Sequence, residues 1–317
     1  MNRINKNLIT LKEKNIDWFY SIKKWFKYGI IQETINDGLG ILLWKEKDNL
    51  LYNKEALWLN KEQQEERWQN ILENTRKNIA NILVWADFKQ PWQNIKIIQW
   101  NKLGENIQNL KDWKIEWVYN IWYTDNLLLE DPFKNSNIKS VALWGAVWDC
   151  ANISSFYKGN EKEIMWISHA WYAGLKNQVV EQLIDSYKSL IWRENIKKII
   201  FDISPLAGIN YEFEEEVLLK LFKNFFKKYD IDHIQDNIYK PYKNNTGKWY
   251  FMTGKLLERI LLENGIEKKQ LNFHPDDTTS YDNKWPSYRL HTLSKQWLYD
   301  WKNIPNSRMW VFNILRK

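Results

Sequence analysis

Two residue types that can do chemistry stand close together near the middle of the chain. The stretch ISHAWYAG, residues 167–174, contains His169, one of four histidines, and the only cysteine is Cys150. A cysteine beside a histidine can form a thiolate nucleophile, or the pair can supply two of the ligands of a zinc ion. The structural alternative is a small buried thiol and a hydrogen-bonded core histidine. Residue types alone leave these interpretations open.

The flanking sequence predicts that both residues lie at the ends of buried strands. Residues 138–158 are apolar and rich in β-branched side chains, with a break near Asp149 and Cys150. They predict a strand, an interruption and a second strand, and residues 162–168 predict a further strand that leads into His169. Apolar residues then recur at helical spacing through residues 173–192. Strand ends that lie side by side in a sheet would bring Cys150 and His169 together.

The remaining pattern intermixes strands and helices without repeats. Strands are predicted at residues 81–88, 94–100, 196–205 and 307–315, and helices at 61–80, 211–229 and 252–266, the last ending at Gly265. This order predicts a single α/β (α+β) domain with mixed β-sheets. Residues 1–28 predict an amphipathic helical extension, which either docks on the domain or lies on a membrane surface.

Composition restricts the class of protein. No run of about 18 apolar residues occurs and the N-terminus does not resemble a signal peptide, so no membrane span is expected. One cysteine cannot form an internal disulfide, which predicts a cytoplasmic protein. The net charge of +7 comes with scattered lysines and no ribonucleoprotein motif, so no nucleic-acid partner is expected.

Five short motifs follow one another in an order that resembles a known family. They contain Asp149 and Cys150; His169, Ala170, Gly174 and Leu175; Pro205, Gly208, Tyr211 and Glu212; Ser287, Tyr288 and Arg289; and Arg308 and Met309. From about residue 29 to the end, the chain resembles the laccase-domain family, also called YfiH-like, polyphenol-oxidase-like or peptidoglycan editing factor proteins. The resemblance implies a laccase-like domain over residues 29–317, with a sandwich of mixed β-sheets and flanking helices.

The resemblance also implies an activity. Relatives are cytosolic zinc proteins that cleave purine nucleosides with phosphate, deaminate adenosine and cleave methylthioadenosine; an older label is copper-dependent phenol oxidation. The family's zinc is held by two histidines and one cysteine, with a position open to water or substrate. Cys150 and His169 are thereby implied as zinc (possibly copper) ligands and catalytic residues, with a purine nucleoside and phosphate as small-molecule partners.

Several family positions are altered in this chain. The third ligand position, a histidine in the family's Gln-Val-His-Gly motif, matches Trp92, and an indole cannot bind zinc. The family's Gly-Trp-Arg after the His-Ala pair is replaced, and so are the alanine before Asp149 and the proline after Cys150; the residues here are Trp171, Tyr172, Ala173, Trp148 and Asn152. These changes add bulk where a substrate would approach and remove a fixed cation.

Other residues have a functional and a structural interpretation. His274 or His291 would supply a third zinc ligand, or both are loop histidines, as His233 is expected to be. Asp149 would orient His169, or cap a turn. Three arginines would bind phosphate, or form structural ion pairs: Arg289, Arg308 and, more weakly, Arg76.

Three functions follow from these alternatives. The first is a purine nucleoside phosphorylase-like enzyme with Cys150 and His169 at its centre. The second is a catalytically degenerate family member that binds a nucleoside or a protein. The third is a metal-independent Cys-His hydrolase. Stoichiometric zinc would favour the first, and rapid alkylation of Cys150 at neutral pH would favour the third.

Overall fold

The computed structural model describes residues 29–33, 39–45, 80, 82–86, 95–99, 118–121, 124–131, 139–159, 162–176, 178–191, 193–208, 211–241, 249–280, 287–295 and 309–316. The predicted extension at residues 1–28 lies outside these ranges. Strand β1 begins directly after it, at Gly29. Three sequence-predicted site residues, Arg76, Trp92 and Arg308, also lie outside the described residues.

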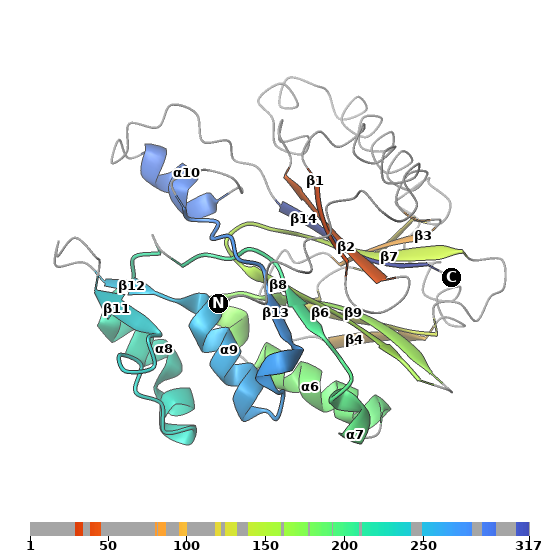
Figure 1. Cartoon of the computed structure of the whole chain (residues 1–317). Helices are drawn as coiled ribbons and strands as arrows, with labels where there is room; N and C mark the ends of the chain where they lie inside the picture. The colour runs from red at the N-terminus through yellow and green to blue at the C-terminus, as the bar shows by residue number, and fades with distance from the viewer. Residues whose placement is uncertain are drawn as a thin grey trace.

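Two six-stranded mixed sheets form the centre of the molecule (Figure 1). Sheet A has, in spatial order, β1 (Gly29–Glu33), β2 (Leu39–Lys45), β14 (Met309–Arg316), β7 (Ser140–Val147), β3 (Ile82–Ala86) and β5 (Val118–Ile121). Sheet B has β13 (Leu271–Phe273), β10 (Phe201–Ile203), β8 (Ala151–Lys158), β9 (Glu163–Ala170), β6 (Asn126–Glu130) and β4 (Ile95–Gln99). Each sheet combines parallel with antiparallel pairs, which confirms the predicted fold class.

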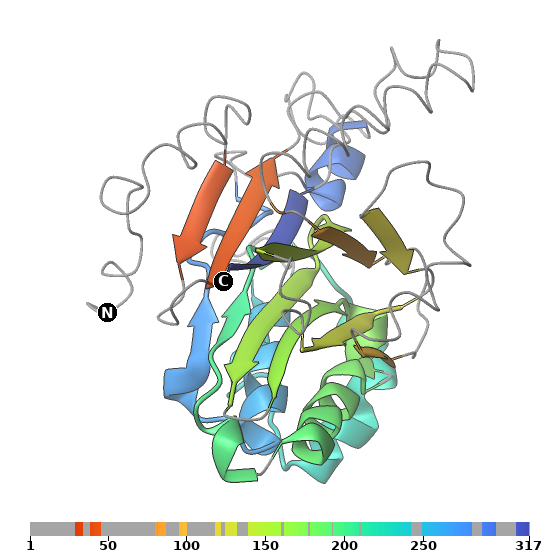
Figure 2. The same ribbon diagram turned by 90° about the vertical axis from the view of Figure 1, so that its right-hand side faces the viewer.

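Helices cover the face of sheet B that points away from sheet A (Figure 1 and Figure 2). This layer contains α5 (Tyr172–Lys176), α6 (Val179–Leu190), α7 (Arg193–Ile196), α8 (Glu215–Lys228) and α9 (Thr253–Glu263). A small hairpin of β11 (Tyr239–Pro241) and β12 (Trp249–Phe251), the 3-10 helix η3 (Lys268–Gln270) and α10 (Tyr288–Lys295) complete the described elements. No helix in the described ranges is long and apolar enough to span a bilayer.

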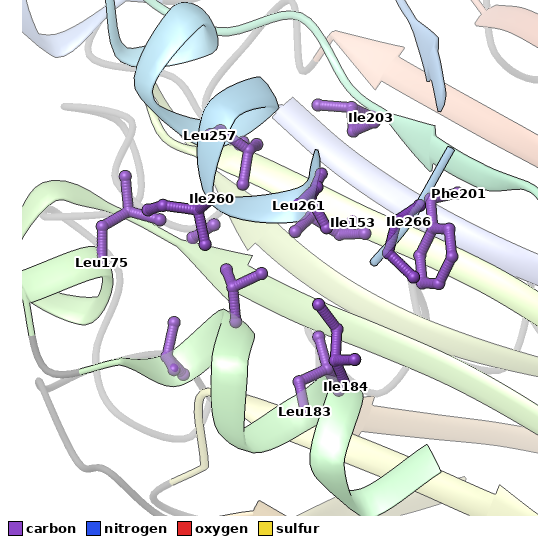
Figure 3. Close-up of a cluster of buried hydrophobic side chains, with 14 of the residues drawn as sticks. Ile153, Leu175, Leu183, Ile184, Phe201, Ile203, Leu257, Ile260, Leu261 and Ile266 are labelled. Carbon is purple, nitrogen blue, oxygen red and sulfur yellow. The ribbon is translucent and has the colours of Figure 1, made fainter. Parts of the chain in front are cut away.

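The alternation of side chains along sheet B assigns its two faces. Ile153 on β8, Trp166 on β9 and Phe201 on β10 belong to the large apolar core that also contains residues of α6 and α9. Figure 3 shows part of this core, where Leu183 and Ile184 of α6 lie near Leu257, Ile260 and Leu261 of α9. The opposite parity of each strand therefore faces sheet A.

The face toward sheet A carries a buried polar row. Asn152 and Ser154 on β8 have the parity opposite to the core residues, and Asp202 pairs with Ser154 in the ladder. The Ser154 hydroxyl donates to Asn152 Oδ1 at 3.2 Å, and Asn272 Nδ2 donates to Asp202 Oδ1 at 2.6 Å. Because buried polar groups cost free energy unless they are paired, this row fixes the register of β8, β10 and β13.

Most elements predicted within the described ranges are present, with one division and one shortening. Apart from its last residue, the helix predicted at residues 61–80 lies outside those ranges, and the strand predicted at 196–205 is limited to β10, because α7 ends at Ile196. The break at Asp149 and Cys150 separates β7 from β8, as expected, and Gly265 ends α9 with φ 88°. The single helix expected at residues 173–192 is two helices, because Gln178 adopts a left-handed conformation with φ 62° between α5 and α6.

Burial of Asp202 makes stability depend on pH. Burial raises the pKa of this carboxyl from 3.8 to about 7, although the hydrogen bond from Asn272 lowers it. The folded chain therefore holds a proton that the unfolded chain releases, so the free energy of unfolding falls as pH rises from about 4 to 7. Asp202→Asn removes this titration and keeps an acceptor for Asn272. The quantity to measure is the Tm of the variant minus the Tm of the native chain. We expect this difference to be about 5 °C larger at pH 8 than at pH 5. An equal Tm difference at both pH values would contradict this assignment.

Candidate functional site

Cys150 and His169 lie at the open end of the β8–β9 hairpin. The last ladder pairs there are Ala151 with Ala170 and Asn152 with His169. Cys150 directly precedes β8 and stands two residues before Asn152, the ladder partner of His169. The strand pairing thus brings the two residues to the same end of sheet B, and His169 lies on the face toward sheet A.

The residue that contacts the His169 ring is Asp125. Its Oδ1 atom lies 3.4 Å from His169 Nδ1, and its backbone oxygen accepts the His169 N–H at 2.8 Å. Both residues are buried, at the ends of paired strands β6 and β9. A carboxylate at Nδ1 fixes the ring orientation and directs Nε2 away from itself. The sequence singled out Asp149 for this role; the pairing of β6 with β9, which no motif spacing reveals, brings Asp125 to the ring.

Asp149 instead binds three segments that are distant in the sequence. Its carboxylate accepts a hydrogen bond from the Thr278 hydroxyl at 2.7 Å, one from the backbone N–H of Arg289 at 2.9 Å, and one from the Ser287 hydroxyl. Its backbone oxygen accepts the N–H of Ala207 at 2.9 Å. The residue directly before Cys150 therefore holds the 204–208 loop, the turn at 278 and the start of α10.

Asp149 and Ser287 together cap α10. The Ser287 hydroxyl oxygen accepts the N–H of Leu290 at 3.1 Å, while Asp149 takes the N–H of Arg289. Both N–H groups belong to the first turn, which has no partners within the helix. The sequence left open that Asp149 caps a turn. Its carboxylate does act as a cap, but the capped element is a helix that follows 140 residues later.

Charged groups surround Tyr211 beside the cysteine. Burial raises the pKa of the Tyr211 hydroxyl, the charges of Cys150, Asp149 and Tyr172 raise it further, and the charge of Arg289 lowers it. Cys150 and Arg289 thus both lie within electrostatic range of the Tyr211 hydroxyl. Burial also raises the pKa of Asp149, assisted by the charge of Asp277 and opposed by its three hydrogen bonds.

Arg289 is a half-buried cation at this site. Its Nη2 atom lies 3.8 Å from Glu212 Oε2, and the Arg289 side chain is 30% exposed. Within the described ranges, Arg289 Nε and Asn152 Nδ2 are enclosed N–H groups that make no hydrogen bond. Enclosed donors are costly without an acceptor. The backbone of Arg289 is bonded to Asp149, the residue before Cys150.

The indole that replaces the family's first glycine lies along His169. The Trp171 and His169 rings are nearly parallel, at 6° and with centroids 6.2 Å apart, and Tyr172 packs edge-on against Trp171 at 5.2 Å. Gly174 makes room for this arrangement, since a Cβ atom there would lie 3.0 Å from Trp171 Cδ1. The large side chain is therefore accommodated by folding back over α5.

The other histidines lie in different surroundings. His274 is buried, its N–H donates to the Ile203 oxygen, and its Nδ1 accepts the N–H of Asp276 at 3.2 Å. His233 contacts Glu215 at 2.8 Å. His291 is on α10, and its side chain lies outside the described part of the chain.

The described residues do not complete a metal site. No group of three or more His, Cys, Asp or Glu side chains suited to a metal occurs among them. Cys150 and His169 are two ligating side chains, whereas zinc sites use at least three protein ligands. Trp92, which the sequence resemblance matches to the third ligand position, lies outside the described residues.

The sequence of this region matches one protein family. Residues 135–295, just over half of the chain, match the family described as multi-copper polyphenol oxidoreductase laccase. The chain belongs to this family. The match includes Asp149, Cys150, His169 and Arg289, and it confirms the resemblance found in the motifs. No curated protein matches the chain.

Solved structures of similar fold extend over nearly the whole chain. Protein YfiH of Bacillus licheniformis, described as hypothetical, has a TM-score of 0.60 at 15% identity, and the match covers 91% of this chain and 96% of that one. YlmD of Geobacillus stearothermophilus has a TM-score of 0.60 at 12% identity, covering 92% and 100%. A Neisseria meningitidis protein has a TM-score of 0.57 at 12% identity, covering 91% and 99%. These likenesses show the fold.

The contacts of Asp149 predict a large effect on stability. Asp149→Ala removes three hydrogen bonds from an enclosed carboxylate, and we expect the free energy of unfolding to fall by about 2–4 kcal/mol. Thr278→Val removes one of them and should cost about 1 kcal/mol. Urea denaturation measures both, with Asp185→Ala, whose side chain is 74% exposed, as the control for loss of a carboxylate. Equal midpoints for Asp149→Ala and Asp185→Ala would refute the role assigned to Asp149.

Proposed function

We propose that the chain cleaves purine nucleosides with phosphate, releasing the base and ribose 1-phosphate. The observation that carries this proposal is the position of Cys150 and His169 at one end of sheet B, with Asp149, the residue before Cys150, bonded to the backbone of Arg289. Membership of the laccase-domain family supports it. The reducing cytoplasm, where the lone Cys150 stays a thiol, is the compartment that suits this chemistry.

The reaction assigns separate tasks to these side chains. A phosphate oxygen forms a bond to C1′ of the ribose while the bond from C1′ to the base nitrogen breaks. The base leaves with the bonding electron pair and takes up a proton. Arg289 binds the phosphate, and His169, oriented by Asp125, supplies the proton through Nε2. Cys150 faces the ribose, where the lone pairs of its sulfur would favour the positive charge that develops at C1′.

No step of this scheme passes through a metal. Zinc or copper remains an expectation from the family, but Cys150 and His169 are only two ligands among the described residues. The side chains named above bind, orient and protonate the substrate with their own groups. Deamination of adenosine and cleavage of methylthioadenosine, which the family resemblance also implies, would use the same nucleoside site.

One observation favours a second candidate function. The contact of His169 with Asp125, beside Cys150, has the order of groups found in cysteine hydrolases: a thiol, a base and a carboxylate that orients the base. A metal-independent hydrolase would attack an acyl or amidine carbon through Cys150 and would need no phosphate. Phosphate dependence therefore separates the two candidates.

Release of hypoxanthine from inosine tests the proposed function. We expect the purified full-length chain to release the base only when phosphate is present and to form ribose 1-phosphate in equal amount. Cys150→Ala and His169→Ala should each lower the rate by at least about 100-fold, because both residues contact the reacting groups. Liquid chromatography of the base and a phosphate-ester assay of the sugar measure the two products.

The matched control is His233→Ala, which removes a histidine outside the site. Release of free ribose without phosphate would identify a hydrolase instead. No release by folded protein, with or without added zinc, would overturn the enzyme proposal and leave a nucleoside- or protein-binding module.

A further inference from the structure

Two aromatic rings meet directly beside the site. Trp148 precedes Asp149 at the end of β7, and Tyr288 precedes Arg289 at the start of α10. Their ring centroids are 5.4 Å apart with an interplanar angle of 43°. Next to this contact, the Asp149 carboxylate accepts the N–H of Arg289. The hydrogen bond that caps α10 therefore also sets the two rings against each other.

The Tyr288 ring is open to solvent. Tyr288 is 54% exposed, and among the described residues only Val217 and Ile234 are other large apolar side chains with comparable exposure. Both of those belong to α8 and the turn after it, whereas Tyr288 adjoins the site residues. A rigidly held aromatic face that remains half uncovered is a surface suited to stacking with a planar ligand.

The position of the pair suits one part of the proposed substrate. Trp148 is two residues from Cys150, so their Cα atoms are at most about 7.6 Å apart. Tyr288 adjoins Arg289, the residue assigned to phosphate. A ligand that stacks on these rings would extend from an aromatic face toward Cys150 on one side and a cation on the other. A nucleoside has matching parts: a flat uncharged base that can stack, joined directly to the reacting C1′ atom of the ribose.

We propose that Trp148 and Tyr288 form the subsite that binds the heteroaromatic base of the substrate by stacking. This inference rests on the proposed function for the identity of the ligand as a nucleoside. The tryptophan at position 148, where the family has alanine, enlarges the platform, because an indole gives the Tyr288 ring a partner that a methyl group cannot provide. Specificity at this subsite comes from ring area rather than from hydrogen bonds, so it accepts several purines.

Equilibrium binding tests the subsite without relying on catalysis. Titration calorimetry of the full chain with inosine, hypoxanthine and inorganic phosphate is compared for three variants. Tyr288→Ala should weaken inosine and hypoxanthine about tenfold and leave phosphate unchanged, because loss of a stacked ring typically costs that much affinity. Tyr288→Phe keeps the ring and should bind as the native chain does. Ile234→Ala, which removes an exposed apolar side chain elsewhere, is the control.

A fourth variant addresses the partly buried member of the pair. Trp148→Phe retains an aromatic ring and should weaken inosine less than Tyr288→Ala does. The inference is overturned if Tyr288→Ala binds inosine as tightly as the native chain, if it loses phosphate to the same extent, or if the native chain binds neither inosine nor hypoxanthine. Ring-dependent binding of inosine without any base release would support the subsite and contradict the phosphorolysis proposal.

Discussion

The Asp149 carboxylate is the contact on which the arrangement of the site depends. It accepts hydrogen bonds from Thr278, from Ser287 and from the backbone of Arg289, while its own backbone holds Ala207. These donors favour the charged form of a partly buried carboxylate. Since Cys150 is the next residue, the same bonds place the residue before the thiol, the 204–208 loop and α10 relative to one another.

Sheet B supplies the other half of the site. Its apolar face packs on α6 and α9, and its polar face toward sheet A carries His169, Asn152 and Asp202. Because the helix layer fixes the strand positions, the antiparallel ladder determines which residue lies opposite His169. Asp125 then meets the imidazole from the neighbouring strand. Packing on one face of the sheet thus determines the chemistry on the other.

Local sequence patterns predicted the strand ends at Cys150 and His169, because β-branched runs and the interruption at Asp149 are local features. The partners of those residues were not predictable in the same way. Asp125 precedes His169 by 44 residues and Asp149 precedes Arg289 by 140, so their contacts depend on strand order and helix placement. The sequence did not predict the division of the helix at Gln178, because the helical spacing of apolar residues continues across this left-handed residue.

The substituted family positions show how a site is remodelled within an unchanged fold. Trp171 lies parallel to His169 over Gly174, and Trp148 packs on Tyr288, so both added indoles find aromatic or glycine neighbours. The two indoles add aromatic surface beside His169 and at the start of α10, within a fold shared with structures only 12–15% identical to it.

The central claim, that Cys150 lies where the nucleoside and phosphate bind, is tested most directly by its alkylation rate. Cys150 is the only cysteine, so intact-mass spectrometry after iodoacetamide treatment reports on this residue alone. We predict that inosine with phosphate slows alkylation several-fold, whereas uridine with phosphate does so less. Equal rates with and without inosine, at concentrations that calorimetry shows to be saturating, would contradict the account.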